Sequence, residues 1–168
     1  MLCTQERTKL KIKFYIALTT LVLLANGCSS TQNEVEYPNL GVSYDALKVP
    51  ELSQMNRFPA RYPAKAVVKN VEGCATIEYV ITPTFDVSDV KVISSTQDYF
   101  AESAKNVIQK WEWSQLPKGV LNLPFKTQTR FEFCLDQPNS PCSSRALSNE
   151  CPGEDVVYSI GSFVRMEG

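Results

Sequence analysis

Alternation of apolar and polar side chains between residues 73 and 81 constrains the fold of this chain more than any other feature. The segment is Gly-Cys-Ala-Thr-Ile-Glu-Tyr-Val-Ile, and its apolar residues at every second position are Ala75, Ile77, Tyr79 and Ile81. Successive side chains of a strand point to opposite faces, so this spacing predicts a strand with one buried face. The sequence therefore favours a sheet that packs one side on a core.

The neighbouring segments have the patterns of further strands and of helices. A turn is expected at Thr82–Asp86, where Pro83 pre-sets the backbone. A helix is expected over Asp98–Trp111, because apolar side chains recur there three or four residues apart. Asp98 is expected to be its N-cap. The expected elements, in chain order, are a short helix over Pro63–Lys69, strands over Cys74–Ile81 and Val87–Ile93, a helix over Asp98–Trp111 and a strand over Thr129–Leu135.

The first 27 residues have the features of an export signal. Four basic residues and one acid precede Phe14–Ala25, an uncharged and mostly apolar run of twelve residues. A basic head followed by a short apolar stretch is typical of a secretory signal peptide. Twelve helical residues span about 18 Å, which is less than the roughly 30 Å of a hydrocarbon core. A permanent transmembrane helix is therefore the weaker interpretation.

The residues at the end of this segment resemble the lipobox of bacterial lipoproteins. Gly27 precedes Cys28, and Ser29 follows it. The resemblance implies that residues 1–27 are removed, that Cys28 is lipidated, and that Ser29 directs the protein to the outer membrane. Asn26 departs from the small or hydroxylated residue usual at its position. The alternative is an ordinary cleaved signal with a coincidental cysteine.

Composition excludes several classes of function. The chain has no histidine, which removes Ser-His-Asp and Cys-His catalysis and every metal site that needs histidine. Without residues 1–27 it has 13 Lys+Arg against 17 Asp+Glu, a net charge of −4 that gives no support to a nucleic-acid partner. The carboxylates near strand ends, Glu72, Asp86 and Asp89, are explained by surface solvation. The sequence thus predicts no catalytic residue, no metal site and no cofactor.

Residues 28–57 are expected to act mainly as a tether between the lipid and a folded domain. They are polar, with Pro38, Gly41 and Pro50 among scattered apolar residues. One short docked piece is expected around Val42–Leu47.

Several short motifs between Pro59 and Leu135 resemble the C-terminal domain of the TonB family of periplasmic energy transducers. They are Tyr62-Pro63, Glu72-Gly73, Ser94-Ser95 and the pair Trp111 and Trp113. The resemblance implies an α+β fold over residues 58–135, in which two helices cover one face of a three-stranded antiparallel sheet of order 2-1-3. Phe85 stands where the hairpin turn of the family normally has glycine. Neither an inner-membrane helix nor a long proline-rich span is recognisable, and a lipid-anchored chain cannot couple to the inner-membrane motor in the usual way.

Four cysteines remain after the signal peptide and the lipidated residue are set aside. Cys74, Cys134, Cys142 and Cys151 form an even set in an exported chain, which favours two disulfides over a metal or redox site. Their number allows three pairings. The sheet order that the resemblance implies favours Cys74–Cys134 and, by remainder, Cys142–Cys151. The last two lie in an extension over residues 136–168, of which residues 156–166 are expected to form a further strand or a flap.

The resemblance also implies a function. Domains of this family bind partners by strand addition to the third strand, here Gln128, Thr129, Arg130, Phe131, Glu132 and Phe133. The expected protein is a lipid-anchored periplasmic binding module, whose partner is an outer-membrane receptor or another envelope protein. The alternative is a structural or assembly lipoprotein with no role in energy transduction. In that case the extension would occupy the third strand's edge.

Overall fold

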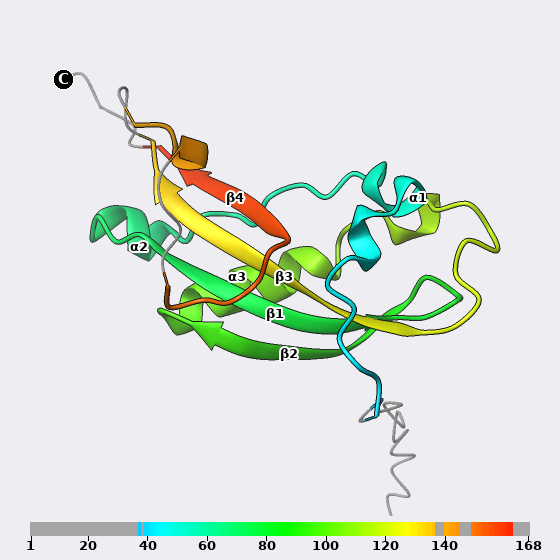
Figure 1. Ribbon diagram of the computed structural model, residues 1–168. Coiled ribbons are helices and arrows are strands. Elements are labelled where there is room, and N and C mark those ends of the chain that lie inside the picture. Colours follow the sequence, from blue (N-terminus) through cyan, green and yellow to red (C-terminus); the bar gives the residue numbers. More distant parts are fainter. Residues whose placement is uncertain (1–36, 38, 137–139, 145–148, 163–168) are drawn as a thin grey trace, which may run out of the picture. The chain divides into compact units, whose positions relative to one another are not determined.

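A four-stranded mixed sheet with helices on one face forms the centre of the molecule (Figure 1). The computed structural model describes residues 37, 39–136, 140–144 and 149–162. The sheet order is β2-β1-β3-β4. The strands are β1 (Gly73–Ile81), β2 (Val87–Ser95), β3 (Phe125–Leu135) and β4 (Val156–Gly161). Among the described residues, no helix is long and apolar enough to cross a membrane.

The predicted helices and strands are present, with small differences at their ends. The helices are α1 (Pro50–Ser53), α2 (Ala64–Val68) and α3 (Asp98–Ile108), and the single-turn 3-10 helices are η1 (Ala46–Lys48), η2 (Trp113–Gln115) and η3 (Cys142–Ser144). The predicted cap at Asp98 is wrong, because Gln97 occupies the N-cap and Asp98 is the first helical residue. Asp98 still places a negative charge in the first turn, where the helix dipole favours it.

The core lies between the sheet and α3. The alternating residues of β1 are fully buried, as the sequence pattern predicts, and so are Phe131 and Phe133 of β3. On α3, the apolar stripe brings Phe100 against Phe133, with ring centroids 4.5 Å apart. Trp111, just after the helix, stacks on Phe131 at 5.8 Å. Tight packing of these rings fixes the distance between helix and sheet.

The α+β fold class is correct, but the predicted three-stranded antiparallel sheet is wrong in strand number and direction. β1 pairs antiparallel with β2 and β3, as expected for the order 2-1-3. β4 comes from the C-terminal extension and adds to β3 in parallel. A parallel neighbour requires the chain to cross the sheet between the two strands. Hydrophobic periodicity does not encode such a crossing, so the sequence left a choice between strand and flap.

The N-terminal segment packs on the domain over more residues than the predicted docked piece. Val42 forms a parallel bridge with Lys126 of β3. Leu47 of η1, Leu52 of α1 and Met55 are buried in the main core cluster. Residues 42–55 are therefore part of the folded unit, whereas the sequence assigned them mainly to a tether.

The β1–β2 turn keeps a left-handed residue even though no glycine is present. Phe85 has φ of 65°. The turn is closed by the N–H of Phe85, which donates to the carbonyl of Thr82 at 2.9 Å, and by the side chain of Thr82, which accepts from the N–H of Asp86 at 3.1 Å. The ring of Phe85 also packs against the core. These contacts hold a conformation that glycine would adopt without strain.

Candidate functional site

The predicted partner-binding strand lies inside the sheet instead of at its edge. Gln128–Phe133 belong to β3, which pairs with β1 on one side from Phe125 to Phe133. On the other side β4 runs parallel to β3, with Arg130 opposite Val156 and Leu135 opposite Gly161. The prediction that Gln128–Phe133 form an edge is therefore wrong for the four residues from Arg130 to Phe133. The reason is that the molecule's own extension fills that edge.

The beginning of β3 is covered by a second segment of the chain. The N–H of Ser43 donates to the carbonyl of Lys126 at 2.8 Å, and the hydroxyl of Thr127 donates to the carbonyl of Ser43 at 2.9 Å. Gln128 lies between this cover and β4, and its side-chain amide donates to Glu78 at 2.9 Å. Two separate pieces of the chain thus occupy the outer side of β3, and the short gap between them lies at Gln128.

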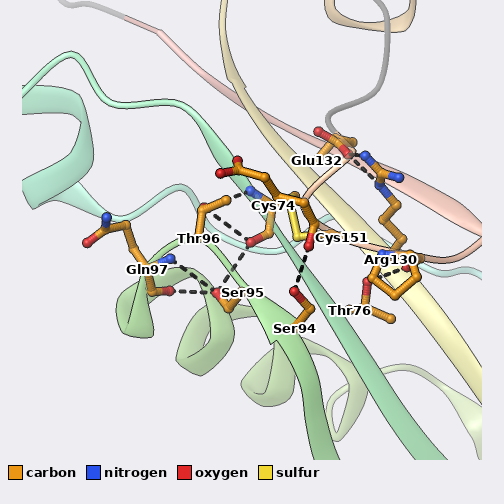
Figure 2. The surroundings of a disulfide bond; sticks show 11 residues. Cys74, Thr76, Ser94, Ser95, Thr96, Gln97, Arg130, Glu132 and Cys151 are labelled. Atoms are coloured by element: carbon orange, nitrogen blue, oxygen red, sulfur yellow. Dashed lines mark hydrogen bonds and ion pairs between the residues drawn. A yellow bond between two sulfur atoms is a disulfide. The ribbon is translucent and has the colours of Figure 1, made fainter.

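The segment of residues 149–155 carries the chain to β4 across the open face of the sheet, opposite the helices; we call it the strap. Figure 2 shows its contacts, which begin at β2 and continue over β1. Ser94 of β2 donates to the carbonyl of Glu150 at 2.7 Å, and Thr76 of β1 donates to the carbonyl of Pro152. Gly153 then lies against Arg130 of β3. The strap thereby touches three strands before β4 begins.

The disulfides pair differently from the prediction. Cys74 bonds to Cys151 in the strap, and Cys134 bonds to Cys142 (Figure 2 shows the first). The predicted pair Cys74–Cys134 is wrong because Cys74 lies opposite Glu132 in the register. Cys134 is therefore two positions away, on the diagonal, where residues are roughly 7–8 Å apart and their Cβ atoms only somewhat closer. This is too far for a disulfide.

A buried polar network fastens the start of β4 on the helix side. The carboxylate of Asp155 accepts from Arg57 at 2.6 Å and from the hydroxyl of Thr129 at 2.7 Å. Thr129 in turn pairs with the hydroxyl of Tyr79 at 2.9 Å. Burial raises the pKa of Tyr79, so this hydroxyl stays protonated and available as a hydrogen-bonding group. The guanidinium of Arg57 also lies 5.7 Å from the ring centre of Trp111.

An ion pair lies beneath the strap on the open face. Arg130 and Glu132, two residues apart on β3, are bonded through the guanidinium and the carboxylate. Their side chains are only 6% and 13% exposed. Burial raises the pKa of Glu132, and the bond to Arg130 opposes part of this rise. The Arg130–Glu132 ion pair therefore lies on the part of the open face that the strap covers.

The candidate carboxylates do not gather into a catalytic site. Glu72 accepts from the N–H of Leu135 at 2.7 Å, Asp86 accepts from Thr84 at 2.8 Å, and Asp89 pairs with Lys91 at 2.8 Å. Three open surface depressions of about 340, 370 and 530 Å³ each contain at most one carboxylate. In the described ranges no group of three His, Cys, Asp or Glu side chains is arranged to hold a metal. Each acid therefore has a local structural role.

Sequence reasoning missed the residues that fasten the extension. The sequence pattern assigns Arg57 to the tether and places Pro152 and Asp155 in the C-terminal extension, and it names no partner for any of the three. Their partners are far away in the chain, as the separation of 98 residues between Arg57 and Asp155 illustrates. The signals of an attached extension were the even cysteine count and the expected strand or flap over residues 156–166. The predicted lipidation at Cys28 and the signal peptide lie outside the described residues.

Comparison with known proteins gives a family match and a similar solved structure. No curated protein matches the chain. A solution NMR structure of the Pseudomonas aeruginosa TonB C-terminal domain is similar, with 20% sequence identity and a TM-score of 0.39; the match covers 46% of this chain and 80% of that one. Residues 59–135, from the segment before α2 to the end of β3, match the family model of the Gram-negative bacterial TonB protein C-terminal.

Proposed function

We propose that this protein is a lipid-anchored protein-binding module on the periplasmic side of the bacterial envelope, linked to TonB-type transport. The observation that carries the proposal is the family match over residues 59–135, which contains α2, β1, β2, α3 and β3. Domains of this family bind an extended strand of a partner along their third strand, which corresponds to β3 here. The expected partner is an outer-membrane receptor or another envelope protein.

The membrane attachment in this proposal depends on Cys28. The sequence before it has a basic head and a short apolar run, and the mature chain carries a net charge of −4. A mildly acidic protein gains little from anionic lipid head groups, so covalent acyl chains would supply the attachment. The resemblance of Ser29 to outer-membrane sorting signals supports an anchor in the outer membrane.

Metabolic labelling tests the anchor. Cells expressing the full chain are grown with an alkyne fatty acid, and their membranes are separated on a density gradient. Wild type should be labelled and should fractionate with the outer membrane, whereas Cys28→Ala should be unlabelled. Equal labelling of the two proteins would contradict lipidation at Cys28, and label in the inner-membrane fraction would contradict the sorting.

A specific observation favours the second candidate, a structural or assembly lipoprotein with no role in energy transduction. The outer side of β3 is already paired with β4 over six residues and bridged at Lys126. The Cys74–Cys151 disulfide retains the strap that leads to β4. A partner strand could add to β3 only after β4 left it, and an edge that stays closed leaves the module a structural role.

Two proline variants of β4 separate these candidates. Bonds from Arg130 to Asp155 and from Asp136 to Gly161 show that odd-numbered residues of this segment face β3. Ser159→Pro therefore removes a donor to β3, whereas Tyr158→Pro removes a donor that points away. A photoreactive residue at Gln128 in the full chain reports the partner in intact cells, and mass spectrometry identifies it.

A binding module should give an adduct with an outer-membrane receptor that is stronger in Ser159→Pro than in Tyr158→Pro or wild type. If neither wild type nor either proline variant gives an adduct with an envelope protein, the result would support the structural lipoprotein. Peptide mapping of both disulfides serves as the control that each variant has folded.

A further inference from the structure

The two edges of the sheet differ in how they are protected. β2, at one end, pairs irregularly with β1, with register shifts between Thr76 and Ile77 and between Glu78 and Val80. Asp89 in β2 has φ of 48° and is paired with Lys91 at 2.8 Å. Irregular pairing and charged side chains are the devices by which proteins prevent an edge from accepting another strand.

β4, at the other end, has none of these devices. Its sequence is Val-Val-Tyr-Ser-Ile-Gly, without a charged residue or a proline. Odd-numbered residues face β3, so the main-chain groups of Val156, Tyr158 and Ile160 point away from the sheet. Within the described residues no backbone hydrogen bond reaches these groups from outside the sheet. Figure 1 shows β4 at the margin of the sheet.

This edge is also held firmly in place. The disulfide of Cys151 and the ion pair of Asp155 fix the residues that lead into β4. At its other end, Gly161 lies so close to the ring of Tyr62 that a Cβ atom would come within 2.8 Å of it. An edge strand anchored at both ends does not fray, so its outer groups form a preorganised template for another strand.

We infer that β4 pairs antiparallel with β4 of a second copy of this chain, around a two-fold axis at Tyr158. In this register Tyr158 faces Tyr158 of the second copy, and Val156 faces Ile160 of the second copy. The match brings β-branched and aromatic side chains into one row and opposes no charges, which are the pairs that stabilise a sheet. A two-fold axis lets one strand satisfy both sides of the interface. Ile160, which is 56% exposed in the single chain, becomes covered.

The size of this interface decides the kind of experiment. Pairing of two six-residue strands buries less than the roughly 1,200 Å² of a stable complex, so the pair is weak when diluted. Crosslinking in intact cells, at the native concentration on the membrane, is therefore the appropriate test. A photoreactive residue is placed at Val156 of the full chain, and two copies with different epitope tags are produced together.

Wild type should give an adduct of twice the chain mass that carries both tags. Tyr158→Pro should abolish it, because the central outward N–H is lost. Ile160→Lys should reduce it about tenfold, which corresponds to about 1.4 kcal/mol. The matched control is Ile93→Lys on β2, where the isoleucine is 44% exposed, and it should leave the adduct unchanged.

Three results would overturn the inference: no adduct from Val156, an adduct with a different protein in place of the second copy, or a two-tag adduct that neither Tyr158→Pro nor Ile160→Lys reduces. Ile160→Lys changes a half-exposed side chain, so it keeps the test decisive if the proline variant does not fold. None of these results depends on the identity of a transport partner, so the inference and the proposed function fail separately.

Discussion

Two glycines let aromatic rings lie directly against strand backbone. At Gly73 a Cβ atom would come within 2.1 Å of the hydroxyl of Thr96 and 2.7 Å of the ring of Phe100. At Gly161 it would meet Tyr62. Both glycines therefore serve close approach, and Gly161, which weakens a strand by its own propensity, is required at that point of β4.

Gly73→Ala should lower the free energy of unfolding by about 1–3 kcal/mol, the usual range for overpacking. The ring of Phe100 is fully buried and the backbone of β1 is fixed on both sides, so neither can move away without loss of contacts. Urea unfolding with the disulfides intact measures the change. Gly41→Ala is the control, because no atom lies within 4 Å of its Cβ position. Equal stability of the two variants would contradict the close approach at Gly73.

The raised pKa of Glu132 predicts that the free energy of unfolding depends on pH. Its pKa is raised above the ordinary 4.5 by burial, so just above pH 4.5 the native protein holds more protons on this carboxyl than the unfolded chain does. Under that condition the contribution of this group to stability falls as pH rises. Glu132→Gln removes this contribution.

The free energy of unfolding of Glu132→Gln, minus that of wild type, should therefore increase as pH rises above about 4.5. Urea unfolding at pH 4, 5 and 6 measures this difference. Loss of the bond to Arg130 lowers the variant's stability, so the trend with pH is the informative quantity. A difference that decreases with pH would show that the pKa of Glu132 is lowered by Arg130.

At the scale of elements, two disulfides of unequal sequence separation hold the C-terminal extension to the sheet. Cys74–Cys151 closes a loop of 77 residues, whereas Cys134–Cys142 closes one of 8. In the chain-entropy model a longer loop removes more freedom from the unfolded chain. The extension therefore owes most of its covalent stabilisation to the bond between Cys151 and Cys74 of β1.

Removal of the long-range disulfide with Cys74→Ser and Cys151→Ser should cost about 4.5 kcal/mol, and removal of the short one with Cys134→Ser and Cys142→Ser about 2.5 kcal/mol. Urea unfolding of the two double variants measures which disulfide contributes more to the free energy of unfolding. Peptide mapping without reductant should find the bonds Cys74–Cys151 and Cys134–Cys142 in wild type. A Cys74–Cys134 peptide would contradict the register of the strap over β1.

At the scale of the whole molecule, chain segments on both sides of the family-matched region complete the fold. Residues 42–55 cover one end of β3, and β4 covers the other. The exposed pair of Lys48 and Glu154 and the half-buried pair of Arg57 and Asp155 join the two segments. The domain is therefore larger than the 59–135 match.

Leu52→Ala tests whether the N-terminal segment is an integral part of the domain. The side chain is 2% exposed in the main core cluster, so its truncation should cost about 2–5 kcal/mol of global stability. Leu123→Ala is the control at 76% exposure and should change stability by less than about 0.5 kcal/mol. A tether that docks only loosely would instead give the same small value for both variants.

The amino-acid sequence determined the elements whose signals are local. The alternation in β1, the apolar stripe of α3 and the strand at Thr129–Leu135 identify themselves because a strand or helix repeats its buried face every two or three to four residues. The short motifs around them identified the region that the family model matches. The sequence also indicated that Cys74, Cys134, Cys142 and Cys151 are bonded, because its export-like signal together with an even set of cysteines favours disulfides.

Only the tertiary structure decided what lies beside β3. The cover depends on contacts such as Arg57 with Asp155, Thr76 with Pro152 and Cys74 with Cys151, whose partners are 76 to 98 residues apart. No local pattern specifies such pairs, because each residue is compatible with many partners until the sheet fixes their positions. The parallel direction of β4 has the same origin: it follows from the path of the strap across the open face. The sequence left open whether the extension covers the edge of β3, and long-range packing closed that edge.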